Sequence, residues 1–273
     1  MSLEKQVLEK LSLFKDNWPM LKNNLRIRER KERIISEIGP EILREVRKIK
    51  EESINNLEQN LNRLERVLEE RGAELKIAKD RDEASRIVLE LCKQYGVKLV
   101  VKSKSLTTEE IELNKVLESN GIEVIETDLG ERIVQLAGQK PSHILGPAFH
   151  MTRNEVAEIF TKYYGRPIPP DPQQIVLEVR KEFREKYQRA GMAVTGANFI
   201  IAENGATVLV TNEGNDRLAL AFAPIHVVIA GVEKIVSSTK DVLKILKILP
   251  RNATGQRLSS YVSFHIPTMK AYP

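Results

Sequence analysis

Residues 97–125 read VKLVVKSKSLTTEEIELNKVLESNGIEVI, and their pattern is the clearest indication of the fold. Residues 97–101 are rich in valine, which is typical of a strand buried on both faces. A helix is expected over residues 108–119, because Thr108 is a good N-cap, acidic residues follow it, and Asn120-Gly121 ends the pattern. A second strand is expected over residues 122–125. This order of strand, helix and strand predicts a βαβ unit in a parallel sheet.

The same alternation of short apolar runs and amphipathic stretches continues along residues 72–273. We expect further strands at 74–78, 142–145, 199–202, 207–211, 226–230 and 261–266, and further helices at 82–95, 129–137, 153–164, 173–189 and 239–249. A chain of 273 residues can bury a large core. The predicted fold class is therefore α/β, built around one core.

Residues 3–71 differ from the rest, because they are dense in Glu, Lys, Arg and Leu and have little strand character. Several helices are expected there, with breaks at Trp18-Pro19 and Gly39-Pro40. Apolar residues recur at helical spacing and predict one face that docks on the core: Ile54, Leu57, Leu61, Leu64 and Leu68. The predicted organisation is a helical arm over residues 1–71 and an α/β domain over residues 72–273.

Cysteine and histidine usage limits the cofactors that this chain can hold. Cys92 is the single cysteine, so a disulfide framework and any cysteine-ligated zinc or iron-sulfur site within the chain are excluded. The four histidines, His143, His150, His226 and His265, lack zinc-site spacing. No P-loop or G-x-G-x-x-G motif is present. We expect no metal site and no cofactor bound by cysteine ligands.

Charge and hydropathy indicate the compartment and the partners. The net charge of +5 comes from 43 basic and 38 acidic residues that are interspersed, so nucleic-acid binding is not expected. The sequence has no signal peptide and no apolar run of membrane-spanning length. The expected protein is cytoplasmic, with no membrane insertion.

Polar residues directly follow the predicted 97–101 strand. Lys102, Ser103 and Lys104 stand at the carboxyl end of that strand and before a helix, where α/β sheets place ligands. Ammonium groups and hydroxyl donors there suit a small carboxylate or another anionic metabolite. The alternative is a solvated loop with two surface lysines.

Three turns rich in Gly and Asn flank consecutive strands and provide the second group of candidates. Such turns let the backbone approach a ligand closely. The candidate ligand-binding residues in them are Asn198, Asn204, Gly205, Thr211, Gly214 and Asn215. The carboxylates of Glu203 and Glu213 are expected to converge there as a nucleophile or general base. The alternative is that Asn204-Gly205 is only a hairpin turn.

Several segments together resemble the lactate-utilization (LUD) domain family, in order, over about residues 55 to 267. They are VKSKS (101–105), TEEI (108–111), GIEV (121–124), ETDLGE (126–131), PSHI (141–144), AFH (148–150), GANF (196–199), TNEGN (211–215) and LPRNATGQ (249–256). The resemblance implies a doubly wound sheet similar to the NagB/RpiA/CoA-transferase group. It also implies a role in oxidising L-lactate to pyruvate together with iron-sulfur partner subunits.

One departure from the family pattern shapes the functional expectation. Full-length members of this type continue into a ferredoxin-like module with C-x₂-C-x₂-C-x₃-C-P runs, which these residues do not contain. The chain is therefore expected to be a cluster-less component of a lactate-oxidising system, dependent on partners for electron transfer.

Two alternatives stay open. Ala202-Glu203-Asn204-Gly205 resembles the S-E-N-G motif of CoA-transferases, in which the glutamate forms the acyl adduct, although Ala replaces Ser here. The chain would then be an acyl-transfer enzyme. The other alternative is a non-catalytic metabolite-binding or scaffolding domain, with the helical arm as its interaction surface.

Overall fold

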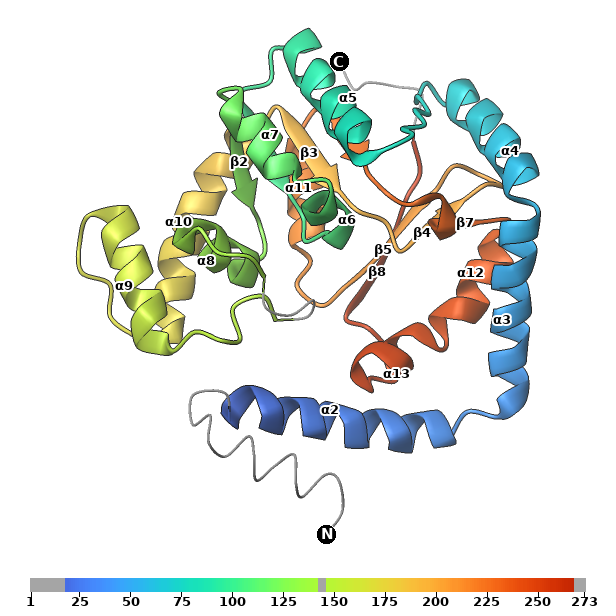
Figure 1. Ribbon diagram of the computed structural model, residues 1–273, viewed down its shortest axis with the longest axis horizontal. Coiled ribbons are helices and arrows are strands. Elements are labelled where there is room, and N and C mark those ends of the chain that lie inside the picture. Colours follow the sequence, from blue (N-terminus) through green and yellow to red (C-terminus); the bar gives the residue numbers. More distant parts are fainter. Residues whose placement is uncertain (1–17, 142–145, 268–273) are drawn as a thin grey trace.

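The computed structural model describes residues 18–141 and 146–267, and it contains a parallel sheet that carries the fold. Sheet A consists of β1 (Leu99–Lys102), β2 (Glu123–Glu126), β3 (Met192–Thr195) and β6 (His226–Val228). Its strand order is β2-β1-β3-β6, and every neighbouring pair is parallel (Figure 1). The predicted βαβ unit around residues 97–125 is confirmed.

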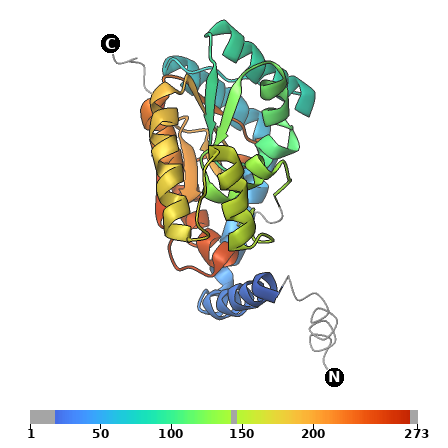
Figure 2. The same cartoon turned by 90° about the vertical axis from the view of Figure 1, so that its left-hand side faces the viewer.

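Helices cover both faces of sheet A. On one face lie α5 (Arg81–Gln94) and α7 (Leu113–Ser119), and on the other lie α8 (Leu129–Ala137), α9 (Arg153–Tyr164), α10 (Pro172–Arg189) and α11 (Asn215–Phe222). Successive side chains of a strand point to opposite faces, so Leu99 and Val101 join one core cluster while Val100 joins the other. Figure 2 shows the long helix α10 standing against one face. The predicted doubly wound α/β fold is confirmed.

A second, mixed sheet is formed by later segments of the chain, with β6 of sheet A lying between its strands in the sequence. Sheet B has the order β7-β4-β5-β8, formed by β4 (Phe199–Ile201), β5 (Thr207–Thr211), β7 (Ile235–Val236) and β8 (Tyr261–His265). Strand β4 is parallel to β7 and antiparallel to β5, and β5 is antiparallel to β8. Helices α12 (Thr239–Leu246) and α13 (Leu249–Thr254) follow β7. The helix expected over residues 239–249 therefore ends early, and a new helix begins at Leu249 with Pro250 in its first turn.

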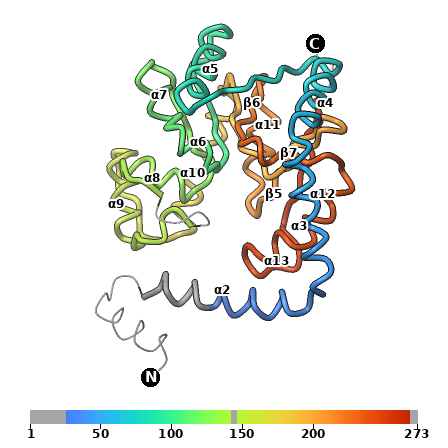
Figure 3. The backbone as a smooth tube through the Cα atoms, turned by 45° about the vertical axis from the view of Figure 1, so that its right-hand side comes forward, coloured from blue at the N-terminus to red at the C-terminus, as the bar shows by residue number. Residues whose placement is uncertain are grey.

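The N-terminal residues form α2 (Trp18–Ser36), α3 (Pro40–Asn55) and α4 (Leu57–Glu70), which confirms the expected helices. Figure 3 shows them bordering the molecule as a bent arm. Ile49 of α3 and Leu64 of α4 are buried against sheet B. Ile54 departs from the expected apolar face: a break at Asn56 leaves it 55% exposed. The arm and sheet B share a core, and the division at residue 71 stays a prediction.

Several expected elements differ in the structure. Residues 74–78 form no strand, and Ile77 there is 64% exposed. The helix expected over 108–119 is split into α6 (Leu106–Glu110) and α7, because Glu112 has a left-handed φ of 50°. Strands β3 and β7 and helix α11 were not expected. The strand expected at 142–145 lies outside the described residues.

Candidate functional site

The strand order of sheet A places a switch point at the carboxyl end of β1. The chain leaves β1 towards β2 and later returns on the other side of β1 to form β3. Connections that leave neighbouring strands in opposite directions open space for a ligand at that end of the sheet. Lys102 is the last residue of β1, and the candidate residues Ser103 and Lys104 follow it. The polar groups discussed below surround this end of the sheet.

Lys102 is fully buried and holds two carboxylates. Its Nζ lies 2.7 Å from Glu109 Oε1, 2.8 Å from Glu126 Oε1 and 2.7 Å from Thr108 Oγ1. Burial alone would lower the pKa of Lys102, but the charges of Glu126 and Glu109 outweigh burial and raise it. The reading of Lys102 as a surface lysine is therefore wrong. Its ammonium is already occupied by protein groups, so the structure gives it no open face for an anionic ligand.

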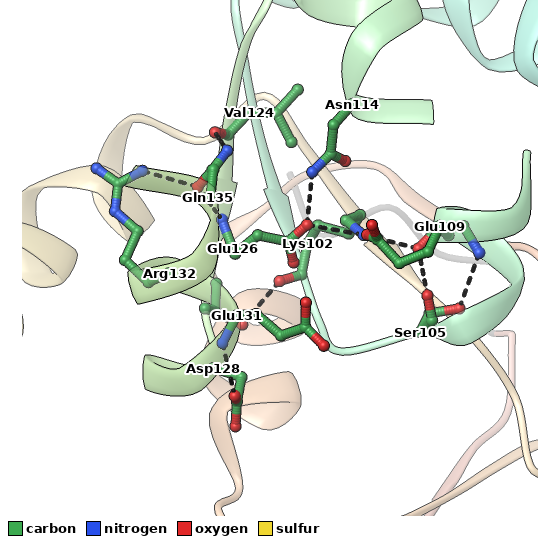
Figure 4. Close-up of polar contacts among 12 residues, drawn as sticks. Lys102, Ser105, Glu109, Asn114, Val124, Glu126, Asp128, Glu131, Arg132 and Gln135 are labelled. Atoms are coloured by element: carbon green, nitrogen blue, oxygen red, sulfur yellow. Dashed lines mark hydrogen bonds and ion pairs between the residues drawn. The ribbon is translucent and has the colours of Figure 1, made fainter. Parts of the chain in front are cut away.

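Short helices position the partners of Lys102. Ser105 caps α6 by accepting a hydrogen bond from Thr108 N at 3.4 Å, which fixes the turn that carries Glu109. Helix α7 then supplies Asn114, whose Nδ2 donates to Glu126 Oε1 at 2.6 Å. Figure 4 shows these side chains converging on Lys102 from separate segments.

Glu131 adds a third carboxylate beside this ion pair. It lies in the first turn of α8, where Asp128 is the N-cap and accepts from Glu131 N at 3.1 Å. The residue is only 7% exposed. Burial, reinforced by the charge of Glu126, raises the pKa of Glu131 to about 7. A carboxyl group with such a pKa can donate or accept a proton near neutral pH.

The three carboxylates border a cleft of about 490 Å³. Its lining comes from α6, α7, β2 and α8 and includes Glu109, Asn114, Glu118, Glu126, Glu131 and Gln135. Gln135 is fixed by donating to Val124 O at 2.7 Å. We call Lys102, Glu109, Glu126 and Glu131 the carboxylate cluster.

Lys104 belongs to a neighbouring group at the same end of the sheet. Its Nζ is 3.5 Å from Asp128 Oδ2 and 4.0 Å from Glu213 Oε1, and its side chain is 27% exposed. Asn215 donates to Thr127 Oγ1 at 3.0 Å. The structure therefore brings together the loops after β1, β2 and β5. Three residues predicted from sequence meet there: Lys104, Glu213 and Asn215.

The remaining predicted residues near this end have structural partners. Ser103 is buried, and its N–H donates to Val194 O at 2.9 Å, which extends the pairing of β1 with β3. Thr211 Oγ1 donates to the buried Asp216 at 3.3 Å. Gly214 has a φ of +73°, and the Tyr261 ring comes within 3.1 Å of the place where a Cβ would be, so glycine suits this position.

The turn that contains Glu203 lies at the other end of β5 from Glu213. Glu203 Oε2 accepts from Thr239 N at 3.0 Å and from Thr239 Oγ1 at 3.1 Å, at the start of α12. These hydrogen bonds lower the pKa of Glu203. Because β5 has five residues, it separates its ends by roughly 13 Å. The expectation that Glu203 and Glu213 converge is wrong.

The residues around Glu203 connect β4 to β5. Asn204 Oδ1 accepts from Ala206 N at 3.0 Å, and Asn198 Oδ1 accepts from Val210 N at 2.8 Å. Gly205 has a φ of +72° and lies against Leu68 of α4. This arrangement is the hairpin turn that was the alternative reading of Asn204-Gly205.

Sequence reasoning missed the acidic members of the carboxylate cluster. A signal was present for Glu126, because it directly follows the second predicted strand in the same way that Lys102 directly follows the first. Glu131 had no comparable signal, since an acidic residue in the first turn of a helix is already explained by its favourable interaction with the helix dipole. Its burial depends on the neighbouring helices, which periodicity does not reveal.

The fold and the polar groups at the carboxyl ends of β1 and β2 define a class: doubly wound α/β proteins with a candidate ligand site at the switch point. The LUD domain family matches residues 61–271, and the chain belongs to this family. Across the described ranges, none of the helices is long and apolar enough to cross a membrane.

The relatives include lactate utilization protein B of Bacillus thuringiensis, Bacillus cereus and Bacillus anthracis. Each is 38% identical to this chain over 215 residues, which is 79% of this chain and 46% of the relative. The chain thus spans about half the length of these relatives. No solved structure matches it.

Proposed function

We propose that this protein acts in lactate utilization as a cluster-less component of a system that oxidises L-lactate to pyruvate. The observation that carries the proposal is the 38% identity to lactate utilization protein B over 79% of the chain. In this proposal the chain binds the small carboxylate, and iron-sulfur partner subunits transfer the electrons. Glu213, Lys104 and Asn215 then belong to the binding region, while Glu203 has a structural role.

The surroundings of Lys104 support carboxylate binding at this place. Its distances of 3.5 Å and 4.0 Å to Asp128 and Glu213 exceed those of a strong charged hydrogen bond. The ammonium group can therefore accept a further anionic partner. Helix α11 begins after Gly214 without a side-chain cap, so its first N–H groups and its dipole also favour an anion.

Titration calorimetry with L-lactate and pyruvate tests the binding step. We expect Lys104→Met to weaken binding by about 1 to 3 kcal/mol, the usual contribution of a charged hydrogen bond. Lys98→Met is the matched control, because Lys98 is exposed and precedes the other end of β1. Equal affinities of the wild type and the Lys104→Met variant would contradict the assignment of Lys104.

Affinity purification of the full chain from its native cells, followed by an assay of lactate-dependent pyruvate formation, tests the assembly. We expect cluster-containing subunits in the purified fraction. Pyruvate formation should require both those subunits and this chain. If the chain purifies without iron-containing proteins and neither lactate nor pyruvate binds, the proposed function is wrong.

The acyl-transfer alternative gains no support from the position of Glu203. A nucleophilic carboxylate must reach a thioester carbonyl, whereas Glu203 accepts two hydrogen bonds at the start of α12. Incubating the protein with an acyl-CoA and searching for an adduct on Glu203 by mass spectrometry tests this alternative directly. A stable adduct on Glu203 would support the acyl-transfer alternative after all.

A further inference from the structure

Three carboxylates from separate elements meet at the cleft beside Lys102. Glu109 comes from α6, Glu126 from the end of β2 and Glu131 from the first turn of α8. One oxygen of each lies within 4.8 Å of the others. The spacing suits oxygens that share one ion, since bonds of 2.0 to 2.6 Å are typical of magnesium and calcium sites.

One of these carboxylates has a buried oxygen that no protein group satisfies, and a second makes no hydrogen bond to the described residues. Among the described residues, Glu126 Oε2 is buried and has no hydrogen-bond partner, although Oε1 of the same group binds Lys102 and Asn114. Glu131 is 7% exposed, and its carboxylate has no hydrogen-bond partner in the part of the chain that the structure describes (Figure 4). A buried carboxylate without a partner is costly, so its presence needs an explanation.

The charges of the carboxylate cluster are also unbalanced. Lys102 compensates one of the three carboxylates, and the neighbouring Asp128 has Lys104 as its own partner. When all three glutamates are ionised, two negative charges remain beside the cleft. A divalent cation would balance them, and oxygen donors alone favour magnesium, manganese or calcium over zinc.

We propose that Glu109, Glu126 and Glu131 bind a divalent cation of this hard, oxygen-preferring class at the edge of the cleft. The cation would satisfy Glu126 Oε2 and the carboxylate of Glu131, which lack protein partners. Lys102 would remain bound to the opposite oxygens and hold Glu109 and Glu126 in place. This site differs from the metal sites considered from the sequence, because it uses no cysteine or histidine.

Manganese binding to the chelator-treated full chain tests the proposal, with free Mn²⁺ measured by electron paramagnetic resonance. We expect one bound ion in the wild type and an affinity lowered roughly tenfold or more in Glu131→Gln, by analogy with losses measured around metal sites. Glu118→Gln is the matched control, because Glu118 lines the same cleft but is not one of the three ligands. Its affinity should stay within about twofold of the wild type.

Competition by Mg²⁺ and Ca²⁺ against Mn²⁺ then identifies the preferred ion. Glu131→Gln carries the test even if a Glu126 variant fails to fold, because the Glu131 carboxylate makes no hydrogen bond that the fold would lose. Circular dichroism checks that each variant is folded. The proposal is overturned if the wild type binds none of the three ions at millimolar concentration, or if folded Glu131→Gln binds them as tightly as the wild type.

Discussion

At the scale of single residues, Lys102 is the group that stabilises the buried charges at the carboxyl end of β1. It is fully buried, and it lies between two glutamates, Glu109 and Glu126, with which it forms ion pairs. Taking a charge out of water is expensive, so a buried ion pair is tolerated only with good geometry. The short contacts to Glu109 and Glu126 meet that condition. Removing either side of the pair should therefore cost more than removing a surface charge.

We expect Lys102→Met to lower the free energy of unfolding by about 3 to 5 kcal/mol, because it leaves Glu126 buried without its counter-ion. Urea unfolding followed by circular dichroism measures this change. The double variant Lys102→Met/Glu126→Gln should recover part of the loss, since it removes the uncompensated charge. Lys98→Met is the exposed control. A Lys102→Met variant as stable as this control would show that the ion pair of Lys102 with Glu126 does not contribute to the free energy of unfolding.

Glu131 should make stability depend on pH. Burial raises its pKa from 4.5 in the unfolded chain to about 7 in the fold, so between these values the folded state binds more protons than the unfolded state. The contribution of Glu131 to the free energy of unfolding is therefore fully present below pH 4.5, and it is lost as the pH rises through 7. We expect Glu131→Gln to be more stable than the wild type at pH 8 and similar at pH 4.5, measured by thermal unfolding with a chelator present. A wild type that is more stable than Glu131→Gln at pH 8 would contradict the raised pKa of Glu131.

At the scale of elements, most helices and strands of residues 97–265 could be predicted, and the exceptions have physical reasons. Strand β3 reads Met192-Ala193-Val194-Thr195, which is only four residues long and begins with Met and Ala, so its place beside β1 is what makes it a strand. Helix α11 follows the Gly214 turn, whose residues indicate a loop. The loops after β1 and β5 were identified as candidates, but the burial of Lys102 depends on packing that the sequence does not display.

The contact of Glu203 with α12 leads to a prediction at this scale. Glu203→Gln should keep the fold and lower the free energy of unfolding by only about 1 kcal/mol, because an amide oxygen still accepts from Thr239. Chemical unfolding measures the change, with Glu65→Gln on the exposed side of α4 as the control. Partner binding should be unaffected. A loss of several kcal/mol would mean that Glu203 does more than hold the start of α12.

At the scale of the whole molecule, the helical arm and sheet B form a common core. Leu64 of α4 is 1% exposed and packs with Ile235 of sheet B and with Ala202, which directly follows β4. The arm should therefore unfold together with the rest of the molecule. We expect Leu64→Ala to shift one cooperative transition by about 2 to 5 kcal/mol, whereas Leu43→Ala, 40% exposed on α3, should have little effect. A separate early transition in Leu64→Ala would show that the arm is an independent unit.

The central position of β1 also has a consequence for how the chain folds. Val100 aligns with Met192 in the sheet, yet β2 and the helices from α6 to α10 lie between them in the sequence. Closing so long a loop costs chain entropy before strand contacts compensate, so the β1–β2 unit should form first. Until β3 arrives, β1 presents an unpaired edge that another copy can occupy. Refolding yield should therefore fall as the protein concentration during dilution from denaturant rises.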